Sequence, residues 1–120
     1  MIIQITGEEF DREVLESDIP VFVCFTATSC GSCFALCVVV EILASEYRDR
    51  IKFVMIDTEK EPEVAEKRGI SPLPAVLLFQ QGKPEKKLVG FHSKGHLMGQ
   101  LDALLEREKH NVSTLAEKED

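Results

Sequence analysis

Two short apolar runs, residues 21–26 and 51–56, constrain the fold of this chain more than any other feature of its sequence. Each run is apolar almost without interruption, which is typical of a strand that is covered on both faces. Between them lies a stretch with apolar residues at helical spacing, including Leu36, Val40 and Leu43. Strand, helix and strand in this order predict a βαβ unit, and therefore an α/β domain.

The rest of the chain extends this pattern to a mixed sheet with helices on both faces, in the order β-α-β-α-β-α-β-β-α. Thr6 and Glu9 have the spacing of a capping box, and Ser93 is placed to cap the last helix. We expect one domain, residues 1–106, followed by a charged, flexible tail, residues 107–120. Apolar residues stop recurring at helical spacing near Arg107. The expected strands are 2–5, 21–26, 51–56, 75–79 and 86–91, the last two joined by a turn at 80–83, and the expected helices lie around 10–15, 33–47, 63–68 and 94–105.

A Cys-x-x-Cys sequence, from Cys30 to Cys33, lies where the second expected strand gives way to a helix. Two thiols at this spacing can close a small disulfide ring. The unpaired N–H groups and the dipole of the helix N-terminus favour the thiolate form of Cys30. In an intracellular chain, such a pair near a βαβ unit is typical of a dithiol redox site. The sequence therefore predicts thiol–disulfide exchange.

Charge and hydropathy argue against several other classes of protein. The net charge of −7 and the scattered basic residues disfavour nucleic-acid binding. No apolar run approaches the ~20 residues that span a membrane. The chain starts with an expected strand rather than an export signal, so we expect a cytoplasmic monomer with reduced cysteines. The following acidic residues predict only a solvated helix face: Glu59, Glu61, Glu63 and Glu66.

Two segments carry a resemblance to a known family. The first is Phe25-Thr26-Ala27-Thr28-Ser29-Cys30-Gly31-Ser32-Cys33, and the second is Gly69-Ile70-Ser71-Pro72-Leu73-Pro74-Ala75. Together with the element order, they resemble the active-site segment and the cis-proline loop of the thioredoxin family. The resemblance covers roughly residues 3–105. It implies a thioredoxin fold and a protein-disulfide reductase activity that requires no cofactor, because the dithiol itself carries the electrons.

The resemblance also implies a role for individual residues. Cys30 would attack a disulfide of a protein substrate, and Cys33 would resolve the mixed disulfide. Pro74 would be cis and lie opposite Cys30, and the backbone of Leu73 would pair with the substrate as an added strand. A thioredoxin reductase, or a similar donor, would reduce the dithiol again. The remaining substrate contacts expected around the dithiol are Ser29, Gly31, Ser32 and Phe34.

Two serines depart from the family pattern next to the dithiol. Ser29 replaces the tryptophan of the active site, and Ser32 replaces the proline between the cysteines. A serine hydroxyl at position 32 can donate a hydrogen bond toward the Cys30 thiolate. Because such a bond stabilises the reduced form, we expect a couple somewhat less reducing than that of a typical thioredoxin.

A second departure lies beneath the dithiol. Cys24 and Met55 occupy positions where the family usually buries an aspartate and places a lysine. Loss of both charges is self-consistent, since either one alone would be left unpaired in apolar surroundings. Cys33 then lacks its usual proton acceptor, which predicts a slower resolving step unless water serves as well.

The remaining cysteines leave alternatives open. Cys37 is expected to pack as a small apolar residue, and Cys24 to lie near Cys33, with which it can pair under strong oxidation. A single zinc ion needs its sulfur ligands within about 4.6 Å of one another, whereas about 10.5 Å of helix separates Cys30 from Cys37. We therefore expect no metal site, although an iron–sulfur cluster is less firmly excluded. A non-catalytic module that holds a client protein in the same groove is the other alternative.

Overall fold

The computed structural model describes residues 2–119 of the chain, and the side chains as far as residue 107. Five strands form one mixed sheet in the order β1-β3-β2-β4-β5. This arrangement confirms the predicted α/β fold and its element order. The strands are β1 (Ile2–Gln4), β2 (Val21–Thr26), β3 (Lys52–Asp57), β4 (Ala75–Gln80) and β5 (Lys83–Val89), and the helices are the π-helix η1 (Asp11–Leu15), α1 (Gly31–Glu46), α2 (Pro62–Lys67) and α3 (Lys94–Glu119).

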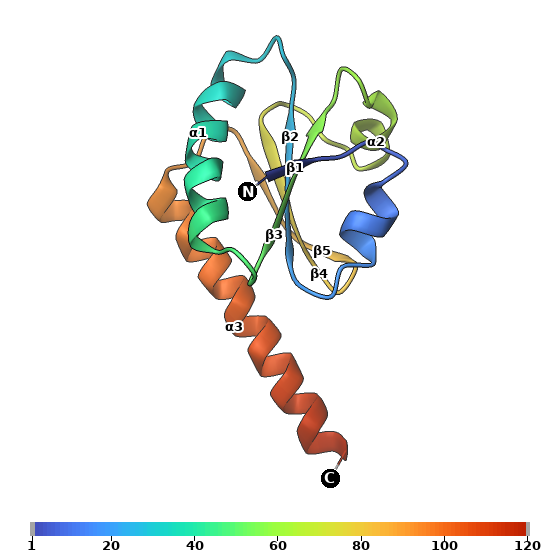
Figure 1. Ribbon diagram of the computed structural model, residues 1–120, viewed down its shortest axis with the longest axis vertical. Coiled ribbons are helices and arrows are strands. Elements are labelled where there is room, and N and C mark those ends of the chain that lie inside the picture. The colour runs from blue at the N-terminus through green and yellow to red at the C-terminus, as the bar shows by residue number, and fades with distance from the viewer. Residues whose placement is uncertain (1, 120) are drawn as a thin grey trace.

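Strand β2 lies at the centre of the sheet and is buried along its whole length. It runs parallel to β3 and antiparallel to β4, and the register places Phe25 opposite Ala75. The end of β2 and the start of β4 therefore lie at the same edge of the sheet. As a result, the segment that carries Cys30 and the loop that carries Pro74 leave the sheet at the same end, the top of Figure 1.

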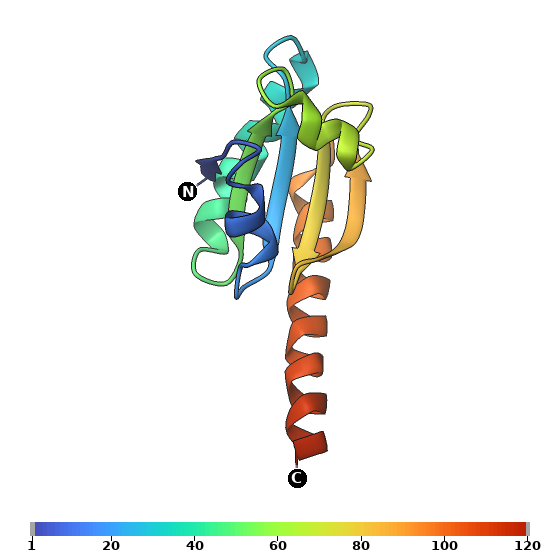
Figure 2. The same cartoon turned by 90° about the vertical axis from the view of Figure 1, so that its right-hand side faces the viewer.

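Helices cover both faces of the sheet (Figures 1 and 2). Helices α1 and α3 pack on one face, and η1 and α2 on the other. Because successive side chains of a strand point to opposite faces, Phe22 and Cys24 of β2 join the core beneath α1 and α3. Val23 and Phe25 join the core beneath η1 and α2. Cys24 of the central strand thus faces α1, which contains Cys33 and Cys37 and has Cys30 as its N-cap.

The expected helix caps are present. The backbone N–H of Thr6 donates to Glu9 Oε1 over 2.9 Å, and the N–H of Glu9 donates to Thr6 Oγ1 over 3.3 Å, which completes the capping box. The N–H of His96 donates to the Ser93 hydroxyl over 3.2 Å at the start of α3. These bonds satisfy backbone donors that have no partner within the helix.

The hairpin between β4 and β5 is tighter than predicted. Its loop consists of Gln81 and Gly82, with φ of 52° and 77°, rather than the four residues 80–83. Two-residue loops with positive φ match the twist of the flanking strands, so pairing continues to Lys83 and ends at Val89. A Cβ atom at Gly82 would also lie 2.8 Å from the backbone oxygen of Leu15, so both conformation and space favour glycine.

Helix α3 covers the sheet with its first half and then extends away from it (Figures 1 and 2). Its first half faces the core with Leu97, Leu101 and Leu104, which are completely buried. The helix continues to Glu119, through the segment that we expected to be a tail, and the domain boundary after residue 106 stays a prediction. Among the helices of the described chain, none is both long and apolar enough to cross a membrane.

Candidate active site

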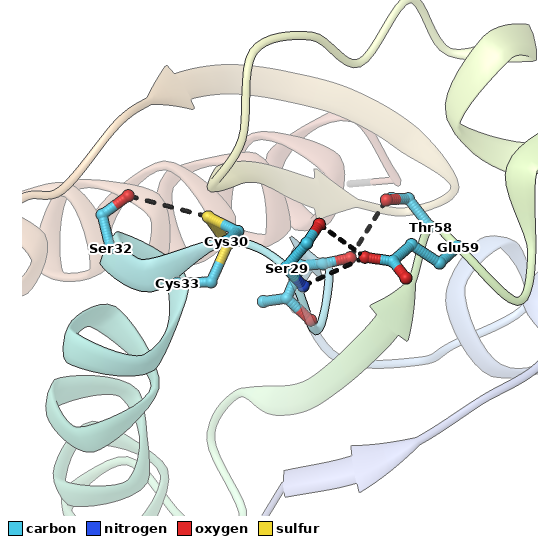
Figure 3. The surroundings of a disulfide bond; sticks show 7 residues. Ser29, Cys30, Ser32, Cys33, Thr58 and Glu59 are labelled. Atoms are coloured by element: carbon cyan, nitrogen blue, oxygen red, sulfur yellow. Dashed lines mark hydrogen bonds between the residues drawn. A yellow bond between two sulfur atoms is a disulfide. The ribbon is translucent and has the colours of Figure 1, made fainter.

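The two cysteines of the Cys-x-x-Cys sequence lie at the first turn of α1 and form a disulfide, as Figure 3 shows. Cys30 is the N-cap of the helix, in an extended conformation with φ of −96° and ψ of 106°, and Gly31 is the first helical residue. The Cα atoms of Cys30 and Cys33 are 5.3 Å apart. Cys30 is half-buried, whereas Cys33 is only 2% exposed. Of the two sulfurs, only that of Cys30 is therefore accessible to another protein.

Ser32 lies within reach of the Cys30 sulfur. Its hydroxyl oxygen is 3.6 Å from Cys30 Sγ, and Figure 3 shows the side chain directed toward that sulfur. Hydrogen bonds to sulfur are long, and this contact strengthens when the sulfur becomes a thiolate. The geometry agrees with the role predicted for this hydroxyl.

Glu59 fixes the segment before the dithiol, which the sequence did not predict. Its Oε1 atom accepts hydrogen bonds from the backbone N–H of Ser29 over 3.0 Å and from the Ser29 hydroxyl over 2.7 Å. The turn after β3 is held in place because Asp57 Oδ1 accepts the N–H of Glu59 over 2.9 Å. The description of Glu59 as part of a solvated helix face was wrong. The sequence did offer a signal for this contact. The two apolar runs form parallel strands, which end at the same edge of a sheet, so the segments that follow them, with Ser29 and Glu59, lie close together.

Thr58 adds a second connection between the same two segments. Its backbone N–H donates to the carbonyl oxygen of Thr26 over 2.8 Å. Its hydroxyl donates to the same oxygen over 3.1 Å, the bond drawn from Thr58 in Figure 3. The backbone N–H of Cys30 donates to the carbonyl oxygen of Ala27 over 3.1 Å, which closes the turn into α1. The segment before the dithiol is therefore held both by bonds to the segment that follows β3 and by a turn of its own.

The expected cis peptide bond before Pro74 is present. The bond between Ser71 and Pro72 is also cis, which the sequence did not predict. Pro74 is buried and Leu73 is half-buried. The carbonyl oxygen of Pro74 accepts the backbone N–H of Gly90 over 2.8 Å, which ties this loop to the end of β5.

An apolar stripe begins next to the dithiol on the outer face of α1. Phe34 is 77% exposed, and Val38 and Ile42 follow it at intervals of four residues, so all three lie on one side of the helix. A Cβ atom at Gly31 would meet nothing within 4 Å. The surface beside the disulfide is therefore both open and apolar.

The other two cysteines, Cys24 and Cys37, lie outside the disulfide and differ in burial. The register places Cys24 beside Met55 on the neighbouring strand, and Cys24 is completely buried. Cys37 of α1 is half-buried rather than packed in the core. The neighbouring thiol of Cys24 lowers the pKa of Cys37 to about 7, whereas the thiol of Cys37 and burial raise the pKa of Cys24. Proximity of Cys24 to Cys33 stays a prediction.

A fold with a βαβ core and a dithiol at a helix N-terminus defines a thiol–disulfide oxidoreductase. Comparison with known proteins specifies the family, because the family model described as Thioredoxin matches residues 1–103. The chain is 39% identical over 98 residues to Thioredoxin 1 of Synechococcus elongatus, which covers 82% of this chain and 92% of that protein. Thioredoxin of Rickettsia bellii is 34% identical over 98 residues, covering 82% of this chain and 93% of its own.

A third relative combines two proteins in one chain. The Bifunctional thioredoxin reductase/thioredoxin of Mycobacterium leprae is 37% identical over 99 residues, which are 82% of this chain and 22% of that longer protein. This chain belongs to the thioredoxin family, and the predicted family and fold are confirmed. Thioredoxins carry electrons on the dithiol itself and act without a cofactor. Among residues 2–107, no three histidine, cysteine or acidic side chains lie close enough to hold a metal ion.

Proposed function

We propose that this protein reduces disulfides of protein substrates through Cys30 and Cys33. The observation that carries the proposal is the unequal burial of the two sulfurs at the N-terminus of α1. A partner can reach half-buried Cys30, whereas Cys33 is buried behind it. The N–H groups of the first helical turn favour negative charge at Cys30, which makes it the nucleophile.

The reaction follows from this placement in two steps. The Cys30 thiolate attacks one sulfur of the substrate disulfide, whose S–S bond breaks as the second substrate sulfur leaves as a thiolate. Cys33 then loses its proton and attacks Cys30 in the mixed disulfide, which releases the first substrate sulfur. The substrate gains two electrons and two protons, and the protein is left with the Cys30–Cys33 disulfide.

The substrate groove is proposed to lie between the dithiol and the cis-proline loop. The register of β2 and β4 brings these two segments to one edge of the sheet. There the backbone of Leu73 is proposed to pair with an extended substrate chain, a mode that depends on main-chain bonds more than on sequence. The other residues proposed to contact substrate are Ser29, Gly31, Ser32, Phe34 and Pro74.

A thioredoxin reductase is proposed as the electron donor. The name of the Mycobacterium leprae relative shows that a reductase and a thioredoxin occur in one chain there. A dithiol reductant works where thiols are kept reduced, so we place the protein in the cytoplasm. We also propose a monomer. Cell fractionation and sedimentation of the purified protein test the location and the state of assembly.

Turnover on insulin tests the exchange mechanism. Wild-type protein is compared with Cys30→Ser and Cys33→Ser, first with dithiothreitol and then with NADPH and a thioredoxin reductase as the donor. We expect Cys30→Ser to lose the acceleration completely. Reduced Cys33→Ser, freed of dithiothreitol before insulin is added, should accumulate a mixed disulfide between Cys30 and insulin, because neither Cys33 nor an added thiol can resolve it. A structure of that trapped complex would show which residues contact the substrate.

The same experiment separates the proposal from the alternative of a client-binding module. A pure binding module would give no acceleration over dithiothreitol in the wild type and no mixed disulfide in Cys33→Ser. That outcome would reject reduction of insulin by Cys30. Retention of client binding in Cys30→Ser would then support a non-catalytic role.

A further inference from the structure

Helix α1 is apolar on its outer face as well as on the face that packs against the sheet. Among its 16 residues only Glu41 and Glu46 are charged, and Glu46 forms an ion pair with Lys94 over 2.7 Å. A surface helix ordinarily carries polar side chains opposite the core, whereas a helix that is apolar all round is typical of an element buried on every side. The composition of α1 therefore indicates that its outer face, too, has a partner.

Three large apolar side chains form a row along this outer face. Phe34, Val38 and Ile42 are 77%, 50% and 45% exposed, and their spacing of four residues places them one above another. Exposed Ala35 and half-buried Val39 form a second uncharged row beside them. We call these five residues the α1 stripe. Exposed apolar side chains that adjoin one another, unlike single ones, mark sites of interaction with other molecules.

The extension of α3 does not supply the partner, because it points away from the end of α1 that carries Cys30 (Figure 1). The size of the stripe also argues against a second copy of the chain. A stable interface buries about 800 Å² on each side and involves about 20–30 residues of each partner. Five residues supply only a small part of such an interface, so the α1 stripe fits a contact whose larger part lies elsewhere.

That larger part adjoins the stripe. Phe34 directly follows Cys33 in the first turn of α1, so the stripe begins where Cys30 is accessible to another protein. From there it continues along the helix to Ile42, about 18 Å from Cys30 along the helix axis. A protein whose disulfide reaches Cys30 therefore also reaches the α1 stripe.

We propose that the α1 stripe is a docking surface for the protein substrates that Cys30 reduces, and that it selects substrates with an apolar surface beside their disulfide. This inference rests on the proposed function, since it extends the contact made at Cys30. Pairing at Leu73 depends on the main chain of the substrate. The α1 stripe adds a requirement for apolar side chains, which a disulfide of only a few atoms does not meet.

Two synthetic peptides test this docking surface. Each contains one intramolecular disulfide followed by a helical segment of about 15 residues, with leucines along one face in the first peptide and glutamines in the second. Reduced protein, freed of dithiothreitol, is mixed with each peptide, and the second-order rate constant of disulfide reduction is measured. We expect wild-type protein to reduce the leucine peptide about tenfold faster than the glutamine peptide.

Val38→Gln combined with Ile42→Gln should abolish this preference. Glutamine is a good helix former, so α1 should stay intact, which urea unfolding checks. Ile3→Gln is the matched control, because Ile3 is also 45% exposed but lies on β1, and it should keep the preference of the wild type. An equal preference in the wild type and the double variant overturns the proposal. A dimer in sedimentation that the double variant abolishes also overturns it, since a second copy would then cover the stripe.

A binding measurement separates this inference from the proposed function. Cys30→Ser cannot attack the peptide, so its affinity for the leucine peptide, measured by calorimetry, reports docking alone. We expect this affinity to fall about tenfold when Val38→Gln and Ile42→Gln are added, and an unchanged affinity overturns the proposal. If the affinity falls as expected while the wild type reduces neither peptide nor insulin, the docking surface is supported and the proposed reductase function is rejected.

Discussion

Ser32 and Ser29 lie on either side of Cys30, but their hydroxyl groups contact different atoms. The Ser32 hydroxyl lies 3.6 Å from the Cys30 sulfur, whereas the Ser29 hydroxyl donates to Glu59 over 2.7 Å. Only Ser32 is therefore placed to stabilise a thiolate on Cys30. The family usually has a proline at this position, which has no group that could do so.

Removal of the Ser32 hydroxyl should make the dithiol more reducing. A hydrogen bond of this kind contributes about 1 kcal/mol, and for a two-electron couple 1.4 kcal/mol corresponds to about 30 mV. We expect Ser32→Ala to lower the reduction potential by about 20 mV, and Ser32→Pro to change it in the same direction. Equilibration with reduced and oxidised glutathione at fixed pH measures this change.

Ser29→Ala is the matched control for that measurement. It removes a hydroxyl at the same distance in sequence from the dithiol, but one that does not contact sulfur, so the potential should stay within error of the wild type. An unchanged or higher potential in Ser32→Ala and Ser32→Pro would show that the serine does not stabilise the thiolate.

At the scale of whole elements, α1 connects the active site to α3. Tyr47, the C-cap residue that follows α1, is 3% exposed, and its hydroxyl donates to Asp102 Oδ1 on α3 over 2.7 Å. Burial, followed by the hydrogen bond and the charge of Asp102, raises the pKa of Tyr47 to about 12 from an ordinary 10.0. Glu46 acts in the same direction, and Arg50 opposes it.

The raised pKa of Tyr47 makes this connection sensitive to alkaline pH. A group with a raised pKa in the folded state contributes its full stability below the unfolded pKa, here about 10, and loses it as pH rises toward 12. We expect Tyr47→Phe to lower the free energy of unfolding at pH 7 by about 1 kcal/mol, because one hydrogen bond is lost. The difference between wild type and variant should shrink between pH 10 and pH 12.

Urea unfolding of both proteins across this range measures the difference directly. Lysines also titrate at alkaline pH, but they are the same in both proteins and cancel in the comparison. A difference that stays constant from pH 7 to pH 12 would mean that Tyr47 ionises as easily in the folded state as in the unfolded chain.

Features that depend on neighbouring residues in the sequence could be predicted, whereas contacts between elements could not. The apolar run of β2, the capping box at Thr6 and the Cys-x-x-Cys sequence each carry their signal within a few residues. The hydrogen bond from Tyr47 to Asp102 depends instead on how α1 lies against α3. The bonds from Ser29 to Glu59 depend on the register of two parallel strands, which no local pattern specifies.

At the scale of the whole molecule, the sheet-covering part of α3 ends before the chain does. Leu101 and Leu104 are completely buried, and the carbonyl oxygen of Leu104 accepts a hydrogen bond from the buried side chain of Gln80 over 3.3 Å. Beyond these residues the backbone of α3 leaves the sheet (Figures 1 and 2). The stability of the domain should therefore reside in residues 1–106.

Two truncations test this boundary. A chain of residues 1–106 keeps both buried leucines, so we expect its free energy of unfolding in urea to lie within about 0.5 kcal/mol of the full chain. A chain of residues 1–100 loses both, and removal of a buried leucine side chain costs about 2–5 kcal/mol. Because small domains are stable by only about 5–15 kcal/mol, the shorter chain should unfold or come close to it. A loss of more than about 1 kcal/mol in residues 1–106 would place the boundary further along α3, and insulin turnover by that chain would show whether the last turns also serve the active site.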